Sequence, residues 1–322
     1  MKKVVYNQFG NVDVLEMMEA EMPAVKKGML LIKVKAAAIN PVDWKMREGQ
    51  LKFMTGRKFP QGLGLEFAGI VEKVGRGVAN YKVGDEVFGT ANHSLAEYVV
   101  AKEKNIWRKP ANVSFEQAST IPVVGECAFN VFDKLIAVKK GSEVLINGAT
   151  GGIGMYVTQI AKQRGAIVTA VVSPKGIALV QKWGVDFVVN YREIDILTAG
   201  KQYGVVVELS DKLLFKQAKA IMKPTATYVA SLPIPLEILS GLVNNLFSSK
   251  KYKLLGTPVK PAYMAALAND AANGATRQRH RSSVSDVAGW DAHRVRERKR
   301  RVGDVLRPPR RARPQSTRRC AE

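Results

Sequence analysis

The sequence predicts an α/β fold in which a β-rich part precedes a doubly wound parallel sheet, with a basic tail at the end. Three observations lead to this prediction. Short strand-like stretches separated by Gly, Pro and Asp fill residues 1 to about 118. From about residue 119, strand and helix patterns alternate along the chain. After Ala271 no periodicity survives, and Arg replaces Lys as the main cation.

The N-terminal part is expected to form a compact, barrel-like β domain. Its strand-like stretches are short and either alternating or apolar, and no long helical pattern separates them. The predicted strands are Lys3–Tyr6, Met29–Ala36, Ala68–Val74, Glu86–Phe88 and Ala96–Val100.

The second part shows the order of a doubly wound sheet. Helical spacing runs over Phe115–Leu135 with an interruption at Pro122. Beyond it, strands rich in Val and Ile show little polar alternation, as expected where helices cover both faces of a parallel sheet. The predicted strands are Glu143–Ile146, Ile167–Val172, Phe187–Val189, Val205–Glu208, Thr227–Ala230 and Lys253–Thr257, and the predicted helices are Ile153–Gln163, Ile177–Trp183 and Lys212–Ile221.

The net charge of +22 is unevenly distributed. Residues 271–322 hold 15 Lys and Arg against 5 Asp and Glu, and 14 of these 15 cations are Arg. The segment has one aromatic residue and few aliphatic ones, so a largely disordered tail is expected. Because basic tails bind nucleic-acid phosphates without much help from the fold, a nucleic-acid-binding scaffold is the alternative function. The absence of interleaved aromatics and of a helical basic stripe disfavours it.

Two further features bear on location and on redox chemistry. No apolar run approaches the about 18 residues of a membrane span, and polar residues between Tyr6 and Asp13 interrupt any signal-peptide pattern. A cytoplasmic location without a membrane partner is therefore expected. Cys127 and Cys320 are too few for a disulfide framework or a cysteine-built zinc site.

A glycine-rich turn is the main functional motif. The stretch INGATGGIGMY over Ile146–Tyr156 follows a buried-type strand and opens a helix, the context in which such turns bind a dinucleotide pyrophosphate. In the Gly-x-Gly-x-x-Gly register, Ala149 takes the first glycine position, so the match is close but not strict. The predicted cofactor-binding residues of the turn are Gly148, Ala149, Thr150, Gly151, Gly152 and Ile153.

The end of the second strand indicates which dinucleotide binds. NAD sites usually place an acidic residue about 20 residues beyond the glycine turn, where it binds the ribose hydroxyls. Here the strand ends in Ser173-Pro174-Lys175, a hydroxyl and a cation that suit a 2′-phosphate. The sequence therefore predicts NADPH. The alternative is that Ser173 caps the next helix and that Lys175 is solvated.

Together these residues resemble the zinc-independent branch of the medium-chain dehydrogenase/reductase family that contains quinone oxidoreductases and enone reductases. The segments that carry the resemblance are Ala36–Lys45 (AAAINPVDWK), Gly64–Gly77, Val83–Gly89, Ala96–Val100, Val144–Lys162 and Lys253–Lys260. The resemblance implies a GroES-like catalytic domain (1–118), a Rossmann NADPH-binding domain (119–254), a returning segment (255–273) and an active site in the cleft between the domains. Residues 274–322 form an atypical basic tail.

The zinc-dependent members of the family differ at the metal ligands. Their Gly-His-Glu motif is Gly64-Leu65-Glu66 here, so Leu65 replaces the imidazole, and no cysteine precedes it. We expect no metal, with Cys127 a packed thiol and His93 a loop residue. Without zinc, the resemblance implies an NADPH-dependent reductase of quinones or α,β-unsaturated carbonyls, whose conjugation spreads the developing negative charge onto an oxygen. A zinc-free alcohol or enoyl-thioester reductase is an enzymatic alternative.

The resemblance also implies roles for individual residues. Asn40 and Lys45 would face the nicotinamide and substrate, with Lys45 stabilising the oxyanion and Asn40 positioning the carbonyl or carboxamide. The plainer alternatives are a turn former for Asn40 and a surface lysine for Lys45. Implied cofactor contacts are Thr120 near the nicotinamide, Tyr191 after the third Rossmann strand and Ser231 after the fifth. Ordinary packing or loop capping is the alternative for these three.

The chain departs from the family at three places. Glu208 and Asp211 stand where an Asp and then a Gly are common, and Pro224-Thr225-Ala226 replaces a Pro-Gly-Gly turn. If those glycines have positive φ, their loss would strain the turn by about 1–2 kcal/mol. The tail does not resemble the family's closing strands, and a frameshifted or replaced terminus that compromises activity is our hypothesis. The resemblance implies a homodimer through the Rossmann sheet edge, which is usual among relatives, although the sequence itself does not fix the oligomeric state.

Overall fold

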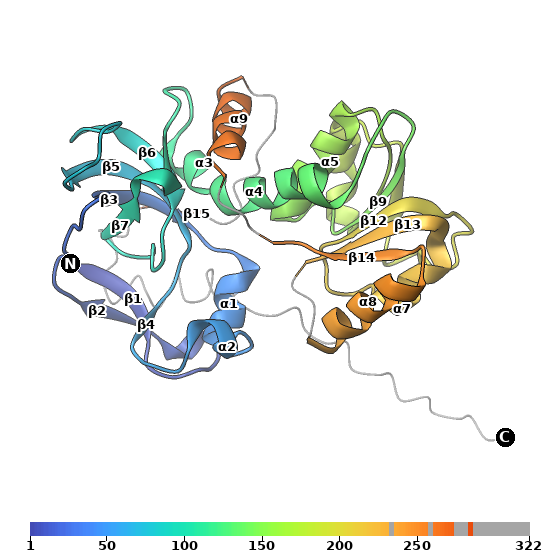
Figure 1. Ribbon diagram of the computed structural model, residues 1–322, viewed down its shortest axis with the longest axis horizontal. Coiled ribbons are helices and arrows are strands. Elements are labelled where there is room, and N and C mark those ends of the chain that lie inside the picture. Colours follow the sequence, from blue (N-terminus) through green and yellow to red (C-terminus); the bar gives the residue numbers. More distant parts are fainter. Residues whose placement is uncertain (232–234, 257–259, 274–282, 286–322) are drawn as a thin grey trace.

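The computed structural model describes residues 1–231, 235–256, 260–273 and 283–285. Its strands form a three-stranded sheet and two six-stranded sheets. Figure 1 shows a β-rich body on the left, the parallel sheet with its helices on the right, and α3, α4 and α9 between them. The predicted α/β fold class is confirmed.

The β-rich body contains two antiparallel sheets. β1 (Lys2–Tyr6) lies between β2 (Leu15–Glu19) and β4 (Gln61–Gly62). The second sheet consists of β3 (Met29–Ala38), β5 (Glu66–Val74), β6 (Glu86–Thr90), β7 (Tyr98–Lys102), β8 (Ile106–Arg108) and β15 (Ser283–Ser285). The short helices α1 (Pro41–Arg47) and α2 (Lys52–Thr55) follow β3, and the 3-10 turns are Val12–Val14 and Glu103–Asn105. All five strands predicted here are present, whereas the short strands β2, β4 and β8 were not predicted.

β15 corrects one expectation for the tail. Ser283–Ser285 pairs antiparallel with Ala36–Ala38 of β3, so a segment expected to be without regular structure adds a strand to the β-rich sheet. Backbone pairing supplies this strand with hydrogen bonds that its sequence pattern does not reveal. The rest of the predicted disordered tail, 274–282 and 286–322, lies outside the described residues.

The other six-stranded sheet is parallel throughout and has the strand order β11-β10-β9-β12-β13-β14. Its strands are β9 (Glu143–Asn147), β10 (Ile167–Val172), β11 (Phe187–Asn190), β12 (Tyr203–Glu208), β13 (Met222–Ala230) and β14 (Lys251–Leu254). The helices that connect them are α5 (Gly152–Gln163), α6 (Ile177–Lys182), α7 (Phe215–Ala218) and α8 (Pro235–Phe247), with 3-10 turns at Pro174–Gly176 and Lys219–Ile221.

Three elements of this sheet differ from the prediction. The helix expected over Lys212–Ile221 is only one turn of α7 plus a 3-10 turn, because the chain first wraps around Glu208. The strand expected at Lys253–Thr257 is shifted to Lys251–Leu254. α8 was not predicted, although Pro235 at its start and regularly spaced leucines favour a helix.

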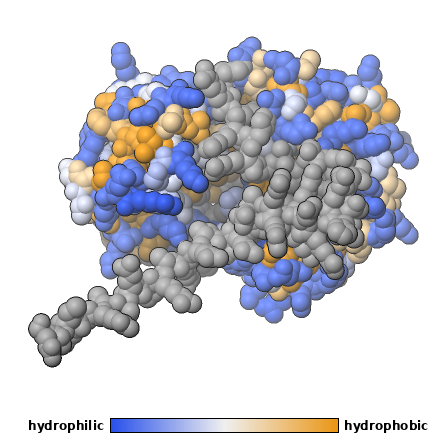
Figure 2. Space-filling model, turned by 180° about the vertical axis from the view of Figure 1, so that it is seen from behind, coloured by the Kyte–Doolittle hydropathy of each residue, from blue (hydrophilic) through white to orange (hydrophobic). Residues whose placement is uncertain are grey.

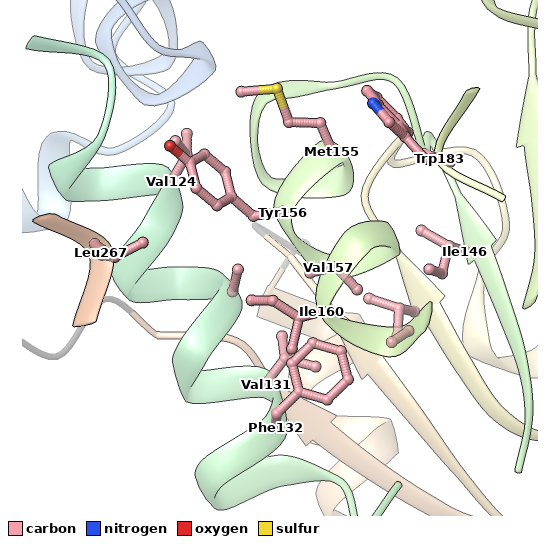
Figure 3. Packing of buried hydrophobic residues seen from close by; sticks show 14 of the residues in the cluster. Val124, Val131, Phe132, Ile146, Met155, Tyr156, Val157, Ile160, Trp183 and Leu267 are labelled. Atoms are coloured by element: carbon pink, nitrogen blue, oxygen red, sulfur yellow. The ribbon is translucent and has the colours of Figure 1, made fainter. Parts of the chain in front are cut away.

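A shared hydrophobic core joins the two bodies. α3 (Phe115–Ser119) and α4 (Pro122–Asn130) arise from the predicted segment interrupted at Pro122, which is the first residue of α4, and a π-helical turn (Val131–Leu135) follows. One buried cluster includes Phe88 of β6, Val124 of α4 and Leu267 of α9 (Pro261–Ala272). Figure 3 shows Val124 and Tyr156 facing each other between α4 and α5. The two bodies are therefore not packed independently.

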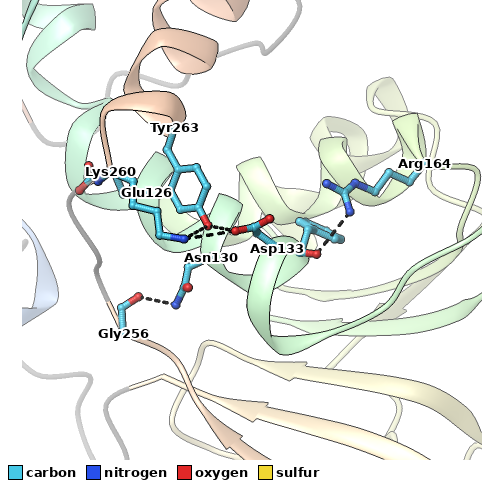
Figure 4. A network of polar contacts seen from close by, with 8 residues as sticks. Glu126, Asn130, Asp133, Arg164, Gly256, Lys260 and Tyr263 are labelled. Carbon is cyan, nitrogen blue, oxygen red and sulfur yellow. Dashed lines mark hydrogen bonds and ion pairs between the residues drawn. The ribbon is translucent and has the colours of Figure 1, made fainter.

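Polar contacts also attach the start of α9 to the π-helical turn that follows α4. Lys260 donates to Asp133 and to the Tyr263 hydroxyl, and Tyr263 donates to Asp133 (Figure 4). Asn130 donates to the carbonyl oxygen of Gly256, which follows β14. These contacts bring the returning segment back to the boundary between the two bodies.

On the face drawn in Figure 2, the coloured surface is a mixture of hydrophilic and hydrophobic side chains. Figure 2, seen from behind, shows hydrophobic side chains gathered in one area of the left half, on the side of the parallel sheet. Within the described part of the chain, no helix combines the length and apolarity that crossing a membrane would require.

Candidate functional site

The parallel sheet has a topological switch point between β9 and β12. From β9 the chain continues through β10 to β11 on one side, and from β12 it continues through β13 to β14 on the other. In open α/β sheets, ligands bind outside the carboxyl ends of the strands at such a point. The residues that follow β9 and β12 are therefore the first candidates for a cofactor site.

The glycine-rich turn lies at this switch point. It leads from β9 directly into α5, and Gly148 takes a φ of +83° that an L side chain rarely adopts. A Cβ at Gly154 would lie 2.2 Å from the carbonyl oxygen of Gly148, so only glycine lets the helix approach the turn this closely. The predicted strand–turn–helix context is thus present.

The start of α5 fits an anionic group. Gly151 is the N-cap residue and has no side chain to accept from the N–H groups of the first turn. Such uncapped N–H groups, together with the helix dipole, favour a phosphate. Binding of a pyrophosphate by the six residues from Gly148 to Ile153 stays a prediction.

The predicted 2′-phosphate residues lie beside the glycine turn. Ser173 precedes the 3-10 turn that follows β10, but its side chain makes no capping hydrogen bond there, contrary to the alternative considered above. Lys175 is exposed. A Cβ at Gly176 would lie 2.8 Å from the Thr150 side chain, so this segment packs closely against the glycine turn.

Of the three remaining predicted cofactor contacts, two lie at the carboxyl edge of the parallel sheet and one does not. Tyr191 follows β11, donates its backbone N–H to Val172 and is 56% exposed. Ser231 follows β13 and donates its backbone N–H to the Glu208 carbonyl. Both therefore lie at the carboxyl edge of the sheet. Thr120 is buried between α3 and α4, and its hydroxyl donates to the Gln117 carbonyl, which is the capping role named as its alternative.

Glu208 is a buried carboxylate at the switch point. One of its oxygens accepts the side-chain amide of Asn147 at 2.6 Å. The other accepts the backbone N–H and the hydroxyl of Ser210, both at 2.6 Å, and the backbone N–H of Lys212 at 3.3 Å. Burial raises the pKa of Glu208, while these hydrogen bonds act to lower it. The loop after β12 is thus folded around one carboxylate.

Asn40 is the N-cap residue of α1. Its backbone N–H donates to Asp43 Oδ2 at 2.7 Å, the acid three residues later in a capping box. Asp43 is fully buried, and burial raises its pKa to about 6 against the hydrogen bonds from Asn40 and Gly64. Asn40 is therefore the N-cap of a helix, whereas the plainer alternative proposed a turn former, and its side chain makes a further contact.

Glu66 receives that side-chain contact. Asn40 Nδ2 donates to Glu66 Oε1 at 2.6 Å, and Glu66 Oε2 accepts the backbone N–H of Val123 at the start of α4 at 2.8 Å. Burial raises the pKa of Glu66 to about 7. From the sequence, Glu66 was noted only as part of the altered Gly64-Leu65-Glu66 motif, so its part in fixing Asn40 was missed.

Lys45 connects the two bodies. It lies on α1 with its side chain only 10% exposed, so the expectation of an ordinary surface lysine is wrong. Lys45 Nζ lies 2.7 Å from Oδ2 of Asp211, in the loop that follows β12. Asp211 has a φ of +58°.

Backbone strain falls at one of the two departures from the family and not at the other. Within the described part of the chain, Asp211 and His93 are the non-glycine residues with positive φ, whereas Thr225 and Ala226 lie inside β13. The strain considered for the Pro224-Thr225-Ala226 turn is therefore not present.

The residues considered for a metal remain separate. Leu65 precedes Glu66 at the start of β5, His93 follows β6, and Cys127 is buried in α4. Among the residues that the structure describes, no three His, Cys, Asp or Glu side chains gather as a metal site would require.

Comparison with known proteins identifies the family of the chain. The model described as "Alcohol dehydrogenase GroES-like domain" matches residues 26–111, and the one described as "Zinc-binding dehydrogenase" matches residues 152–231. The chain is 31% identical over 265 residues to the chloroplast envelope quinone oxidoreductase homolog of Arabidopsis thaliana, a match that covers 78% of this chain and 80% of the relative. It is 35% identical over 221 residues to the chloroplastic NADPH-dependent alkenal/one oxidoreductase of the same plant, covering 65% of this chain and 57% of the relative.

Solved structures show the same architecture. The quinone oxidoreductase from Coxiella burnetii superposes with a TM-score of 0.80 at 28% identity, covering 93% of this chain and 96% of that one. The Escherichia coli quinone oxidoreductase complexed with NADPH superposes with a TM-score of 0.77 at 22% identity, covering 95% and 96%. At 22% identity, the second likeness supports the fold alone.

Proposed function

The chain belongs to the family of medium-chain dehydrogenase/reductases that contains the quinone oxidoreductases, and from this premise we propose that it transfers a hydride from NADPH to quinones or α,β-unsaturated carbonyls. One observation carries the proposal. Lys45, from the β-rich body, reaches Asp211 in the loop after β12, and β12 is the neighbour of the strand that ends in the glycine turn. A cation that can stabilise an oxyanion and a turn that fits a pyrophosphate thus lie at the same edge of one sheet.

Each residue has a role in this proposal. Bound NADPH supplies the hydride. The glycine turn and the start of α5 hold the pyrophosphate, and Thr120, Tyr191 and Ser231 contact other parts of the cofactor. Lys45 stabilises the negative charge that develops on the substrate oxygen, because an ammonium group in a partly buried site acts more strongly than in water. The orientation of the Asn40 amide is set by its hydrogen bond to Glu66. In this proposal, Asn40 positions the carbonyl of the substrate or the carboxamide of the cofactor.

The cofactor preference rests on Ser173 and Lys175. Both follow β10 beside the glycine turn, where the adenosine ribose of a dinucleotide lies in sheets of this kind. A hydroxyl and an exposed ammonium group suit the 2′-phosphate of NADPH, and the described end of β10 carries no acid that would favour NADH.

We also propose that the reaction needs no zinc. One matching family model is described as a zinc-binding dehydrogenase, but Leu65 has no atom that binds a metal, and Glu66 already accepts from Asn40 and Val123. Metal analysis of the purified enzyme tests this proposal. A stoichiometric zinc ion whose removal abolishes activity would contradict it.

The central test is an NADPH-oxidation screen over small quinones, enones and alkenals, with NADH in parallel. Turnover with at least one of these acceptors and a preference for NADPH are expected. Failure of every acceptor, with the protein shown to be folded, would reject the proposed function.

A homodimer through the edge strand β14 is also proposed. β14 pairs only with β13 among the described strands, and α8 beside it exposes a row of large apolar side chains. Their exposed fractions are 71% for Leu236, 61% for Leu239, 54% for Leu242, 49% for Val243, 77% for Leu246 and 85% for Phe247. An open edge next to an apolar helix face favours pairing with a second copy. Light scattering should give the mass of a dimer for the wild type and that of a monomer for Leu246→Glu. A monomeric wild type would exclude the proposed dimer.

Two other predictions remain proposals. The domain boundaries are those given for the sequence, and a cytoplasmic location is proposed, with cell fractionation as its test. The comparisons favour the reductase over a nucleic-acid-binding scaffold, since the relatives are oxidoreductases over most of the chain.

A further inference from the structure

The ion pair between Lys45 and Asp211 joins residues that are 166 positions apart in the sequence. One comes from α1 of the β-rich body and the other from the loop after β12 in the parallel sheet. The Lys45 side chain is 10% exposed and the Asp211 side chain 43% exposed, so the pair is partly withdrawn from water and is screened less than a surface pair.

The base of the Lys45 side chain is firmly placed. α1 is fixed at its start by the Asn40–Asp43 capping box, and Asn40 is tied to Glu66. A lysine side chain nevertheless has four rotatable bonds, and ordering them costs conformational entropy. A lysine that stabilises an oxyanion at a defined point therefore needs something to hold its ammonium group.

The position of Asp211 is equally determined by its neighbours. Ser210 and Lys212 on either side of it both donate to the same oxygen of Glu208. Between these two anchors Asp211 takes a left-handed backbone conformation, which Asp tolerates better than most residues other than glycine. This loop therefore presents a carboxylate to Lys45.

The contact fixes the direction of the Lys45 ammonium group. The ion pair with Asp211 holds this group at the edge of the sheet where β9 and β12 end. Correct placement of a charge is worth much of its catalytic effect, since misplacement by about 1 Å can cost on the order of 100-fold in rate.

We propose that Asp211 is the positioning residue for Lys45: it holds the ammonium group at the carboxyl edge of β12, where the substrate oxygen becomes negatively charged. This inference rests on the proposed reductase function. Asp211 itself touches neither substrate nor cofactor in this role, and it acts only through Lys45.

A double-mutant cycle tests the proposal. Asp211→Asn keeps the size of the side chain and tolerates the left-handed backbone, and it should lower kcat about 5- to 30-fold. NADPH affinity, measured by direct binding, should not weaken, because the substitution removes a negative charge from the neighbourhood of an anionic cofactor. Lys45→Met should lower kcat by about 100-fold or more, with little effect on NADPH binding. In the Lys45→Met background, Asp211→Asn should have no further effect on kcat.

Two controls separate positioning from a structural role. Asp211→Gly relieves the backbone conformation and also removes the carboxylate, so it should lower kcat as Asp211→Asn does while keeping the melting temperature. Glu72→Gln changes the same charge at an exposed position of β5 and should leave kcat and NADPH affinity as in the wild type.

The outcomes are distinguishable. If the wild type is active, two results would overturn the positioning role alone. One is an unchanged kcat for Asp211→Asn. The other is that Asp211→Asn lowers kcat equally in the wild type and in the Lys45→Met variant. A wild type that binds no NADPH and reduces no acceptor would reject the proposed function and this inference together.

Discussion

At the scale of single residues, the candidate site contains side chains that form hydrogen bonds with other residues of the protein. Asn40 donates to Glu66, and Lys45 is paired with Asp211. Each of these two side chains is thus held by an acidic residue for which the sequence had predicted no such role. Ser173 and Lys175 differ from them, since Ser173 makes no capping hydrogen bond and Lys175 is exposed, which leaves both available to a ligand.

The role of Lys175 leads to a prediction about cofactor choice. Lys175→Ala should weaken NADPH binding about 10- to 100-fold, because it removes one charge-assisted contact worth about 1.5–3 kcal/mol to the 2′-phosphate. NADH lacks that phosphate, so its affinity should change less than about twofold by the same argument. Titration of both cofactors measures the two constants. Lys182→Ala, at an exposed position of α6, is the matched control, and equal losses for NADPH and NADH in Lys175→Ala would defeat the assignment.

At the scale of elements, the approach of α5 to the end of β9 sets the shape of the cofactor turn. Gly154 lies on the first turn of the helix and faces the Gly148 carbonyl. Because Gly154 has no side chain, the first turn of α5 can lie close to the end of β9. α8 shows the same use of glycine, since a Cβ at Gly241 would lie 2.4 Å from the Tyr252 ring of β14.

Gly154→Ala should therefore damage both stability and cofactor binding. The added methyl group would lie 2.2 Å from a backbone oxygen, and overpacking of this kind costs about 1–3 kcal/mol. Because the strain falls on the turn itself, NADPH affinity should drop at least about tenfold. Gly204→Ala in β12 is the control, since the nearest atom to its Cβ would be 3.7 Å away. If denaturant unfolding and NADPH titration gave the same result for both variants, the packing argument would be wrong.

At the scale of the whole molecule, buried acids gather where the two bodies meet. Glu66 of β5 binds Val123 of α4, and Glu126 of α4 accepts the backbone N–H of Lys260 at the start of α9. Burial raises the pKa of Asp43 to about 6, of Glu66 to about 7 and of Glu126 to about 8. The same boundary contains the hydrophobic cluster shared by β6, α4, α5 and α9, so the junction of the two bodies is also where charge is costly.

These acids predict a pH dependence of stability. Each folded pKa lies above its ordinary value of 3.8 or 4.5, so between about pH 5 and pH 8 the folded state binds more protons than the unfolded state. The stabilising contribution is complete at low pH and is lost as the pH rises through the folded pKa values. The melting temperature should therefore fall from pH 5.5 to pH 8.5 as a consequence of this proton linkage.

Glu126→Gln should reduce the fall of the melting temperature with rising pH. The variant should match the wild type near pH 5, where Glu126 is protonated, and exceed it in melting temperature near pH 8, where the wild type must ionise a buried acid. Glu21→Gln, at an exposed position, should keep the wild-type profile. A wild-type melting temperature that rises steadily over this interval would contradict the prediction.

The sequence by itself determined those structural features that depend on residues close together in the chain. The spacing of apolar residues predicted the alternating strands and helices of the parallel sheet, and the glycines from Gly148 to Gly154 predicted the turn between β9 and α5. These features are readable because strand and helix periods, and the backbone freedom of glycine, act over a few residues.

Only the tertiary structure decided which distant residues meet. Glu66 and Val123 are 57 positions apart, and Lys45 and Asp211 are 166 positions apart. No local pattern marks such pairs, because they form only when the β-rich body packs against the parallel sheet through α4. The same packing buries Lys45, which sequence alone left open as a surface lysine, and adds β15 to β3 from a segment without periodicity. The sequence thus named Asn40 and Lys45, while the fold supplied the acids that hold them, since burial and long-range contact are properties of the packed chain.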